Sequence, residues 1–238
     1  MFKIGPTYDL THPISAKVYH PFGSPSFEQY ESFEREGAQT SKVKMSLHTG
    51  THLDSPAHFV NGGKSLDQIT VDHFIGEGLI LDVSQEFGPT CKANQAILAK
   101  DLAEAEKATR QKLKTGYIVL VHTGWHHIFE SEPERYYRDY SSLSDEAGKW
   151  LAEKKVKMVG IDACDVDPHQ FYEKPPYKPP NHTTNFLPNN ILICENVGGE
   201  IDSVIGKKVL LIVSPLRLVA EASPARIIAL KFKRRVKL

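Results

Sequence analysis

The stretch "HTGTHLDSPAH" (residues 48–58) places three histidines and one aspartate within eleven residues that also contain a glycine and a proline. In an α-helix, His48 and His52 would share a face, but Asp54 would lie roughly 240° around the axis from His48. In a straight strand these side chains would all point to one side, with His48 and Asp54 about 20 Å apart. They can therefore reach one metal ion only if the chain bends.

Gly50 and the pair Ser55-Pro56 predict where the chain changes direction. Glycine adopts backbone angles that other residues avoid, and serine followed by proline is typical of a helix N-cap and first helical position. We therefore expect a bend followed by a short helix. Nitrogen and oxygen ligands without sulfur suit Zn²⁺, Mn²⁺ or Fe²⁺. The alternative, unconnected surface histidines beside a helix cap, would explain one histidine better than the whole set.

Two distant residues are candidates for the same site. Glu195 lies in the apolar strand-like run "ILICENV" (191–197), where an unpaired ionised carboxylate would be costly. His182 precedes it in a proline-rich loop, and a loop followed by a strand can bring both to one edge of a sheet. Each has an ordinary alternative: a solvated loop histidine and a strand-end carboxylate.

Two further segments carry ligand-type residues. "GIDACDVDPH" (160–169) holds three aspartates and a histidine after a buried strand, but it lacks the pattern of a calcium-binding EF-hand loop, so turn capping is the favoured interpretation over a separate metal site. In "GWHHIF" (124–129) the paired histidines are best explained as the start of a helix. Cys164 has no paired base nearby in sequence and is not expected to be a nucleophile.

Short aliphatic runs alternate with helix-forming segments along the chain. This order predicts an α/β (or α+β) fold, a mixed β-sheet with packed helices, in one domain over residues 1–238. The loop at 167–188 contains prolines that argue against regular elements. The expected strands are 79–84, 117–124, 156–162, 190–197, 208–214 and 226–232, and the expected helices are 99–113 and 144–155, the second capped by Ser144.

Composition restricts the classes of partner. Basic and acidic residues both number 29, so the formal net charge is zero and no general attraction to nucleic acid or acidic membranes is indicated. No run approaches the roughly 18 apolar residues of a membrane span, and the N-terminus lacks the apolar core of a signal peptide. Three widely spaced cysteines argue against a disulfide framework. We expect a cytoplasmic protein with a small-molecule substrate and no nucleic-acid or membrane partner.

These residues resemble the metal-dependent cyclase family, which includes bacterial-type kynurenine formamidases and isatin hydrolases. The family signature H-x-G-T-H-x-D-x-P-x-H is matched at every specified position by residues 48–58. The resemblance continues through 58–84, 116–125, 159–167, 181–197 and 213–230 and so covers nearly the whole chain. It implies a swivelling β/β/α domain assembled into homodimers or homotetramers.

The resemblance also implies roles for individual residues. His48, His52 and Asp54 match the primary metal ligands, and His58, His182 and Glu195 match the remaining positions of the site. In two-metal members the last three help to hold a second ion, whereas in one-metal members the last histidine of the motif is a catalytic base. The expected cofactor is therefore one or two ions of Zn²⁺ or Mn²⁺, and His58 has two possible roles.

The activity that follows is metal-dependent hydrolysis of a carbon–nitrogen bond in an amide, formamide or lactam, with His58 or Glu195 moving the proton. N-formylkynurenine is the first candidate substrate by family analogy. Two alternatives stay open: a non-catalytic metal- or ligand-binding member, and a polyketide-type cyclase. Cys164 and the long loop before His182 depart from the commoner family pattern and leave the substrate, not the chemistry, in question.

Overall fold

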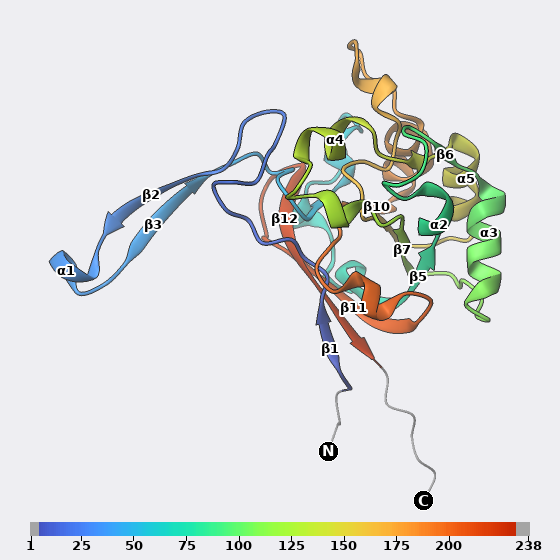
Figure 1. Cartoon of the computed structure of the whole chain (residues 1–238), viewed down its shortest axis with the longest axis horizontal. Helices are drawn as coiled ribbons and strands as arrows, with labels where there is room; N and C mark the ends of the chain where they lie inside the picture. Colours follow the sequence, from blue (N-terminus) through green and yellow to red (C-terminus); the bar gives the residue numbers. More distant parts are fainter. Residues whose placement is uncertain (1–4, 232–238) are drawn as a thin grey trace, which may run out of the picture.

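The computed structural model describes residues 5–231 and is built on one large mixed β-sheet (Figure 1). Its strands are ordered β1-β12-β11-β5-β7-β9-β10-β4. They are β1 (Thr7–Asp9), β4 (His52–Asp54), β5 (Ile75–Asp82), β7 (Ile118–His122), β9 (Met158–Ile161), β10 (Leu192–Glu195), β11 (Lys208–Pro215) and β12 (Ala222–Lys231). The predicted mixed sheet with packed helices is confirmed.

The short strand β4 closes this sheet into a ring. It pairs antiparallel with β10 on one side and with the first residues of β12 on the other. Strands β5, β7, β9 and β10 run parallel to one another, and β11 and β12 are antiparallel to their neighbours. Because parallel strands are covered on both faces, their sequences are continuous apolar runs, which is why they could be predicted.

Alternating side chains of each buried strand belong to two cores. On β7, Val119 and Val121 pack with Leu102 and Leu151, which come from the helices α3 (Ala99–Ala108) and α5 (Asp145–Glu153). Ile118 and Leu120 point the other way, into the interior of the ring. The helices lie side by side on the outer face of β5 and β7 (Figure 1). The rigid sheet between the two cores positions the strand ends where the candidate ligands lie.

Smaller elements surround this frame. They are α1 (Phe33–Glu36), α2 (Ser84–Phe87), α4 (Pro133–Arg138), β2 (Ser26–Glu31), β3 (Thr40–Lys44), β6 (Ala96–Ile97) and β8 (Ser142–Leu143). Among the described residues, strands β2 and β3 pair only with each other. With α1 between them, they form an arm that extends away from the body (Figure 1). This arm, residues 26–44, was not predicted.

Local predictions are mostly confirmed, with two corrections. Ser144 caps α5 by accepting a hydrogen bond from the Ala147 backbone N–H at 3.1 Å. The helix expected over 99–113 ends at Ala108. Residues 167–188 were expected to lack regular elements, but they contain single 3₁₀ and π-helical turns, which their prolines permit because each turn is so short: His169–Tyr172, Asn181–Asn185 and Leu187–Asn189.

Within residues 5–231, none of the helices combines the length and the apolar composition required to cross a membrane. The assignment of residues 1–238 to one domain stays a prediction, and its two ends, 1–4 and 232–238, lie outside the described residues.

Candidate metal centre

The bend predicted between His48 and Asp54 is present. Gly50 adopts a φ of 62°, in the left-handed region that favours glycine. The chain then enters β4 and continues from Ser55 into the 3₁₀ turn Pro56–His58. Ser55 occupies the predicted N-cap position with Pro56 in the first turn, but its hydroxyl donates to the Glu221 carbonyl at 2.9 Å and makes no capping hydrogen bond with the described residues. That bond ties the motif to the segment leading into β12.

The register of β4 against β10 assembles the core of the centre. Glu195 lies directly opposite His52, and Asp54 follows two residues further along the same strand. Opposite residues in an antiparallel pair share a face, as do residues two apart, so all three side chains point to one side. His52 Nε2 lies 3.6 Å from Asp54 Oδ1 and 3.5 Å from Glu195 Oε2.

His48 and His58 complete one side of Asp54. His48 Nδ1 lies 3.0 Å from Asp54 Oδ1, and the His48 and His58 rings pack with centroids 4.4 Å apart. His48, Asp54 and His58 can offer one ligand atom each within 4.8 Å of one another. His48 is only half-buried, whereas His52 and Asp54 are buried, so the centre faces solvent on the His48 side.

His182 completes the other side. Its Nε2 lies 3.6 Å from Asp54 Oδ2 and 3.7 Å from Glu195 Oε1. Its Nδ1 contacts Asp167 Oδ2 at 2.8 Å, and the same oxygen accepts the His182 backbone N–H at 3.0 Å. The six predicted residues therefore lie in one cluster. Asp167, which positions His182, was missed as a functional residue, although its place in "DVDPH" after a strand was noticed.

The two buried imidazoles are oriented by their outer nitrogens. His52 Nδ1 contacts the Gly50 carbonyl at 2.8 Å, as His182 Nδ1 contacts Asp167. With Nδ1 as the donor in each ring, Nε2 carries a lone pair toward the centre. Metal-binding histidines are held in this way by hydrogen-bond acceptors outside the ligand set.

Three buried polar atoms at the centre make no hydrogen bond with the described residues: His52 Nε2, Asp54 Oδ1 and Asp54 Oδ2. A buried polar atom without a partner costs free energy, and a charged one costs more. The three atoms lie close together, at the nitrogen–oxygen distances given above, and they belong to side-chain types that divalent metals prefer as ligands. The residues present therefore fit a divalent metal ion.

The electrostatics of the metal-free protein agree with this fit. Burial alone would lower the pKa of His48, but Asp54, Glu195 and Glu221 outweigh it and raise the pKa to about 9. Burial, reinforced by the Asp54 charge, raises the pKa of Glu195 to about 8 even though His182 opposes it. Burial lowers the pKa of His58 to about 3. Protons on His48 and Glu195 thus balance negative charge that a divalent cation would balance instead.

The aspartates of the "GIDACDVDPH" segment lie in two different environments. Asp162 accepts hydrogen bonds from Thr123 N–H, Thr123 O–H and Gly124 N–H at 2.7, 2.5 and 2.7 Å, so the capping interpretation describes it correctly. Asp165 lies with Asp167 beside His182. Burial raises the pKa of the Cys164 thiol, which keeps it protonated and agrees with the prediction that it is not a nucleophile.

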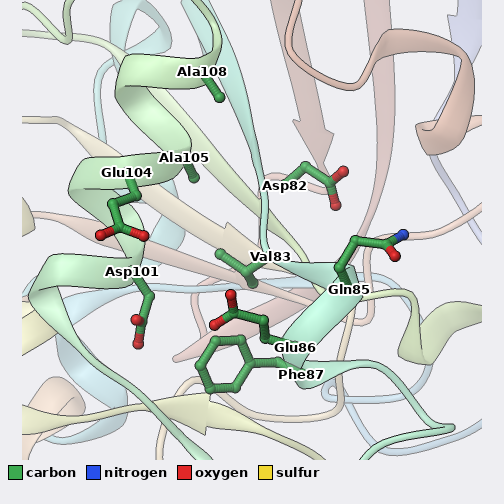
Figure 2. A pocket seen from close by; sticks show the side chains of 9 residues that line it. All are labelled: Asp82, Val83, Gln85, Glu86, Phe87, Asp101, Glu104, Ala105 and Ala108. Carbon is green, nitrogen blue, oxygen red and sulfur yellow. The ribbon is translucent and has the colours of Figure 1, made fainter.

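A surface hollow of about 220 Å³ lies elsewhere, between α2 and α3 (Figure 2). Figure 2 shows the carboxylates of Glu86, Asp101 and Glu104 around it. It contains none of the six predicted residues, so it is separate from the candidate metal centre.

Comparison with known proteins agrees with this geometry. A kynurenine formamidase of Bacillus cereus is 28% identical over 222 residues, which cover 92% of this chain and 94% of that protein. The structure of isatin hydrolase A from Labrenzia aggregata matches with a TM-score of 0.81 at 22% identity, covering 96% of this chain and 94% of that one. Isatin hydrolase A from Ralstonia solanacearum gives a TM-score of 0.82 at 22% identity, covering 95% and 92%. The structural matches establish the shared fold.

A family model covers most of the chain, including the bend and β4. The model of the Cyclase family, described as "Putative cyclase", matches residues 8–168. The match contains His48, His52, Asp54 and His58. Beyond its end, the turn Asn181–Asn185 adds His182 and strand β10 adds Glu195. The predicted family is confirmed: the chain belongs to the Cyclase family.

Proposed function

We propose that this protein is a metal-dependent hydrolase that cleaves the carbon–nitrogen bond of an amide, formamide or lactam in a small carbonyl compound. The observation that carries this proposal is the buried Asp54 carboxylate. It lies among imidazoles, and its two oxygens make no hydrogen bond with residues 5–231. Curated relatives of the chain are named kynurenine formamidase, which is an activity of this class.

We assign two ions to the centre, because the oxygens of Asp54 face different partners. Oδ1 lies near His48 and His52, whereas Oδ2 lies near His182, which in turn lies near Glu195. The residues that would hold the ions are His48, His52 and His182 with the carboxylates of Asp54 and Glu195. Glu195 lies near both sides, because its Oε2 is 3.5 Å from His52 Nε2 and its Oε1 is 3.7 Å from His182 Nε2. Zn²⁺ suits this histidine-rich set best, and Mn²⁺ is the alternative. A bound divalent ion lowers the pKa of water and polarises a carbonyl.

His58 is the proposed proton carrier. Its ring lies between His48 and His182, with centroids 4.4 and 5.6 Å away, and it makes no hydrogen bond with the described residues. Glu195 is less suited to carry the proton, because its Oε1 accepts a hydrogen bond from the Val166 N–H at 2.9 Å. Water adds to the carbonyl carbon, the carbon–nitrogen bond breaks, and His58 passes the proton lost by water to the leaving nitrogen.

Aromatic side chains beside the centre favour an aryl substrate. The Phe59 ring lies 4.6 Å from the His58 ring and 5.0 Å from the His182 ring, and Tyr172 lies 6.5 Å from Phe59, all as centroid distances. Flat aromatic groups pack well against such rings. With the names of the relatives, this makes an N-formyl aryl amine such as N-formylkynurenine the first candidate, and a cyclic aryl amide such as isatin the second.

A small substrate panel tests the proposal. Purified protein is loaded with Zn²⁺ or Mn²⁺ and assayed with N-formylkynurenine, isatin and a simple lactone. Hydrolysis of either nitrogen compound supports the proposal. A metal-loaded protein that turns over none of the three supports the non-catalytic alternative, and cyclisation of a linear polyketide-type substrate without hydrolysis supports a cyclase.

We also propose that the protein forms a homo-oligomer. A two-stranded hairpin is marginally stable alone in water, yet the arm formed by β2, α1 and β3 extends from the body with Phe27, Phe33 and Val43 exposed. A second copy of the chain is the partner we propose for it. The cytoplasmic location stays a prediction.

A further inference from the structure

Three histidines near the end of β7 converge on Asp202. His122 is the last residue of β7, Gly124 turns the chain with a φ of 83°, and His126 and His127 follow in the 3₁₀ turn Trp125–Ile128. His122 Nε2 lies 3.0 Å from Asp202 Oδ1, and His127 Nε2 lies 2.8 Å from Asp202 Oδ2. His126 Nε2 lies 3.6 Å from the same Oδ2. All three rings thus present the same nitrogen to one carboxylate.

Two of these rings are held from behind by carboxylates, of which Asp162 is buried and Asp82 is exposed. His122 Nδ1 lies 2.9 Å from Asp82 Oδ1, and His126 Nδ1 lies 2.8 Å from Asp162 Oδ2. A carboxylate at Nδ1 fixes the ring orientation and leaves Nε2 as the ligand atom, an arrangement common among metal-binding histidines. Ion pairing alone explains the contacts of His122, which lies between two carboxylates, but it leaves His126 unexplained.

His126 has an unsatisfied buried nitrogen. The residue is only 6% exposed, and its Nε2 makes no hydrogen bond with the described residues. This atom points toward Asp202 at a distance too long for a hydrogen bond. A cation between His126 and Asp202 would satisfy this nitrogen.

We infer that His126, His127 and Asp202, which can offer ligand atoms within 4.8 Å of one another, form a second site for a divalent transition metal, separate from the centre at Asp54, and that His122 positions Asp202. Two imidazole nitrogens and one carboxylate oxygen without sulfur suit Zn²⁺, and water could occupy a fourth position. The side chains of His127 and Asp202 are 55% and 51% exposed, so an ion can enter from solvent. The two sites share no residue. An ion here would cross-link the end of β7 to the turn Ile201–Val204 and stabilise the fold.

The site is tested by counting bound zinc in single variants. His127→Gln and Asp202→Asn alter exposed side chains, so both proteins should fold as the wild type does, which circular dichroism checks. After dialysis against the same free Zn²⁺, each should contain one equivalent less per chain than the wild type by mass spectrometry of the metal. His73→Gln changes a half-buried histidine next to an aspartate outside both sites and should lose none. Unchanged counts in both variants, or an equal loss in His73→Gln, would overturn the inference.

A second measurement separates this site from the proposed hydrolase. In a His48→Ala/His52→Ala protein the centre at Asp54 loses two ligands, but the second site is intact. This protein should bind one equivalent of Co²⁺ more than the same protein carrying Asp202→Asn in addition, and that equivalent should contribute the visible absorption of tetrahedral cobalt. A folded His48→Ala/His52→Ala protein that binds no Co²⁺ contradicts the second site, whatever the wild type hydrolyses.

Discussion

His52 on β4 lies directly opposite Glu195 on β10, with its Nε2 3.5 Å from Glu195 Oε2. Side chains alternate between the faces of a strand, so a shift of one residue in this register would move Glu195 away from His52 and Asp54. Cys194 faces the ring interior, and Leu53, its partner in the register, packs in the same core. The apolar core therefore fixes the register that assembles the metal centre.

Asp167 should act on the centre through His182. Asp167→Asn removes the charged acceptor at His182 Nδ1, so the ring can adopt the other tautomer and Nε2 is a weaker ligand. We expect roughly a 10- to 100-fold loss of metal affinity or activity, measured by metal titration and kcat/KM. Asp145→Asn is the matched control, because Asp145 also anchors the turn Asn181–Asn185, through Asn185, without contacting His182. Equal losses in both variants would mean that Asp167 only supports the turn.

His58→Asn separates the two roles open to this residue. If His58 carries the proton, the substitution should reduce kcat by about 10²- to 10⁴-fold while the number of bound ions stays the same. The measurement pairs steady-state kinetics with metal analysis of the same sample. If the variant instead loses one equivalent of metal, His58 is a ligand and the proton is carried by another group. His73→Asn should leave both readouts unchanged.

Asp162 should be a major determinant of stability. Its carboxylate is fully buried and accepts hydrogen bonds from Thr123 and Gly124 as well as pairing with His126. Asp162→Ala leaves these donors unpaired and should cost about 3–5 kcal/mol of unfolding free energy, measured in urea with a chelator present. Asp72→Ala, at an exposed carboxylate, should leave the unfolding free energy nearly unchanged. A loss below about 1 kcal/mol for Asp162→Ala would contradict this assignment.

The same carboxylate predicts a dependence on pH. Burial alone would raise the pKa of Asp162, but the hydrogen bonds from His126 and Thr123 and the nearby His122 outweigh it and lower the pKa. A carboxyl group whose pKa is lower in the folded than in the unfolded protein stabilises the fold above its unfolded value of about 4, and this contribution fades as the pH falls through the folded value. The stability difference between wild type and Asp162→Asn should therefore narrow in acid. A difference in unfolding free energy between the two proteins that stays constant from pH 7 to pH 3 would contradict the lowered pKa of Asp162.

The arm should determine the oligomeric state. Phe27 on β2 and Val43 on β3 are cross-strand partners, and each is about half exposed. If a second copy covers them, Phe27→Glu/Val43→Glu should convert the oligomer to monomers, as measured by light scattering after size exclusion. Ser41→Glu adds charge to the same arm outside this pair and should not. A wild-type protein that is monomeric at micromolar concentration would remove the proposed role of the arm.

Local chemistry explains which parts of this structure were predictable. The bend at Gly50 and the candidate ligands around it lie within eleven residues. The apolar runs of β7 and β10 predict strands, and within the second run Glu195 is recognisable as an unusual charged residue. The histidines at 126 and 127 were assigned only to a helix start, which is correct for the backbone. Their partner Asp202 lies 75 residues from His127, and nothing local links the two. The arm was missed because β2 is exposed along most of its length and lacks the alternation that marks a half-buried strand.

Removal and return of metal test the central claim most directly. The wild-type protein is stripped of metal with a chelator, and formate release from an N-formyl aryl amine is followed before and after Zn²⁺ or Mn²⁺ is added back. We predict that the rate falls to background on stripping, returns on addition in the wild type, and does not return in His52→Ala. Hydrolysis at the full rate by metal-free protein, or by His52→Ala, would contradict a catalytic metal centre at Asp54.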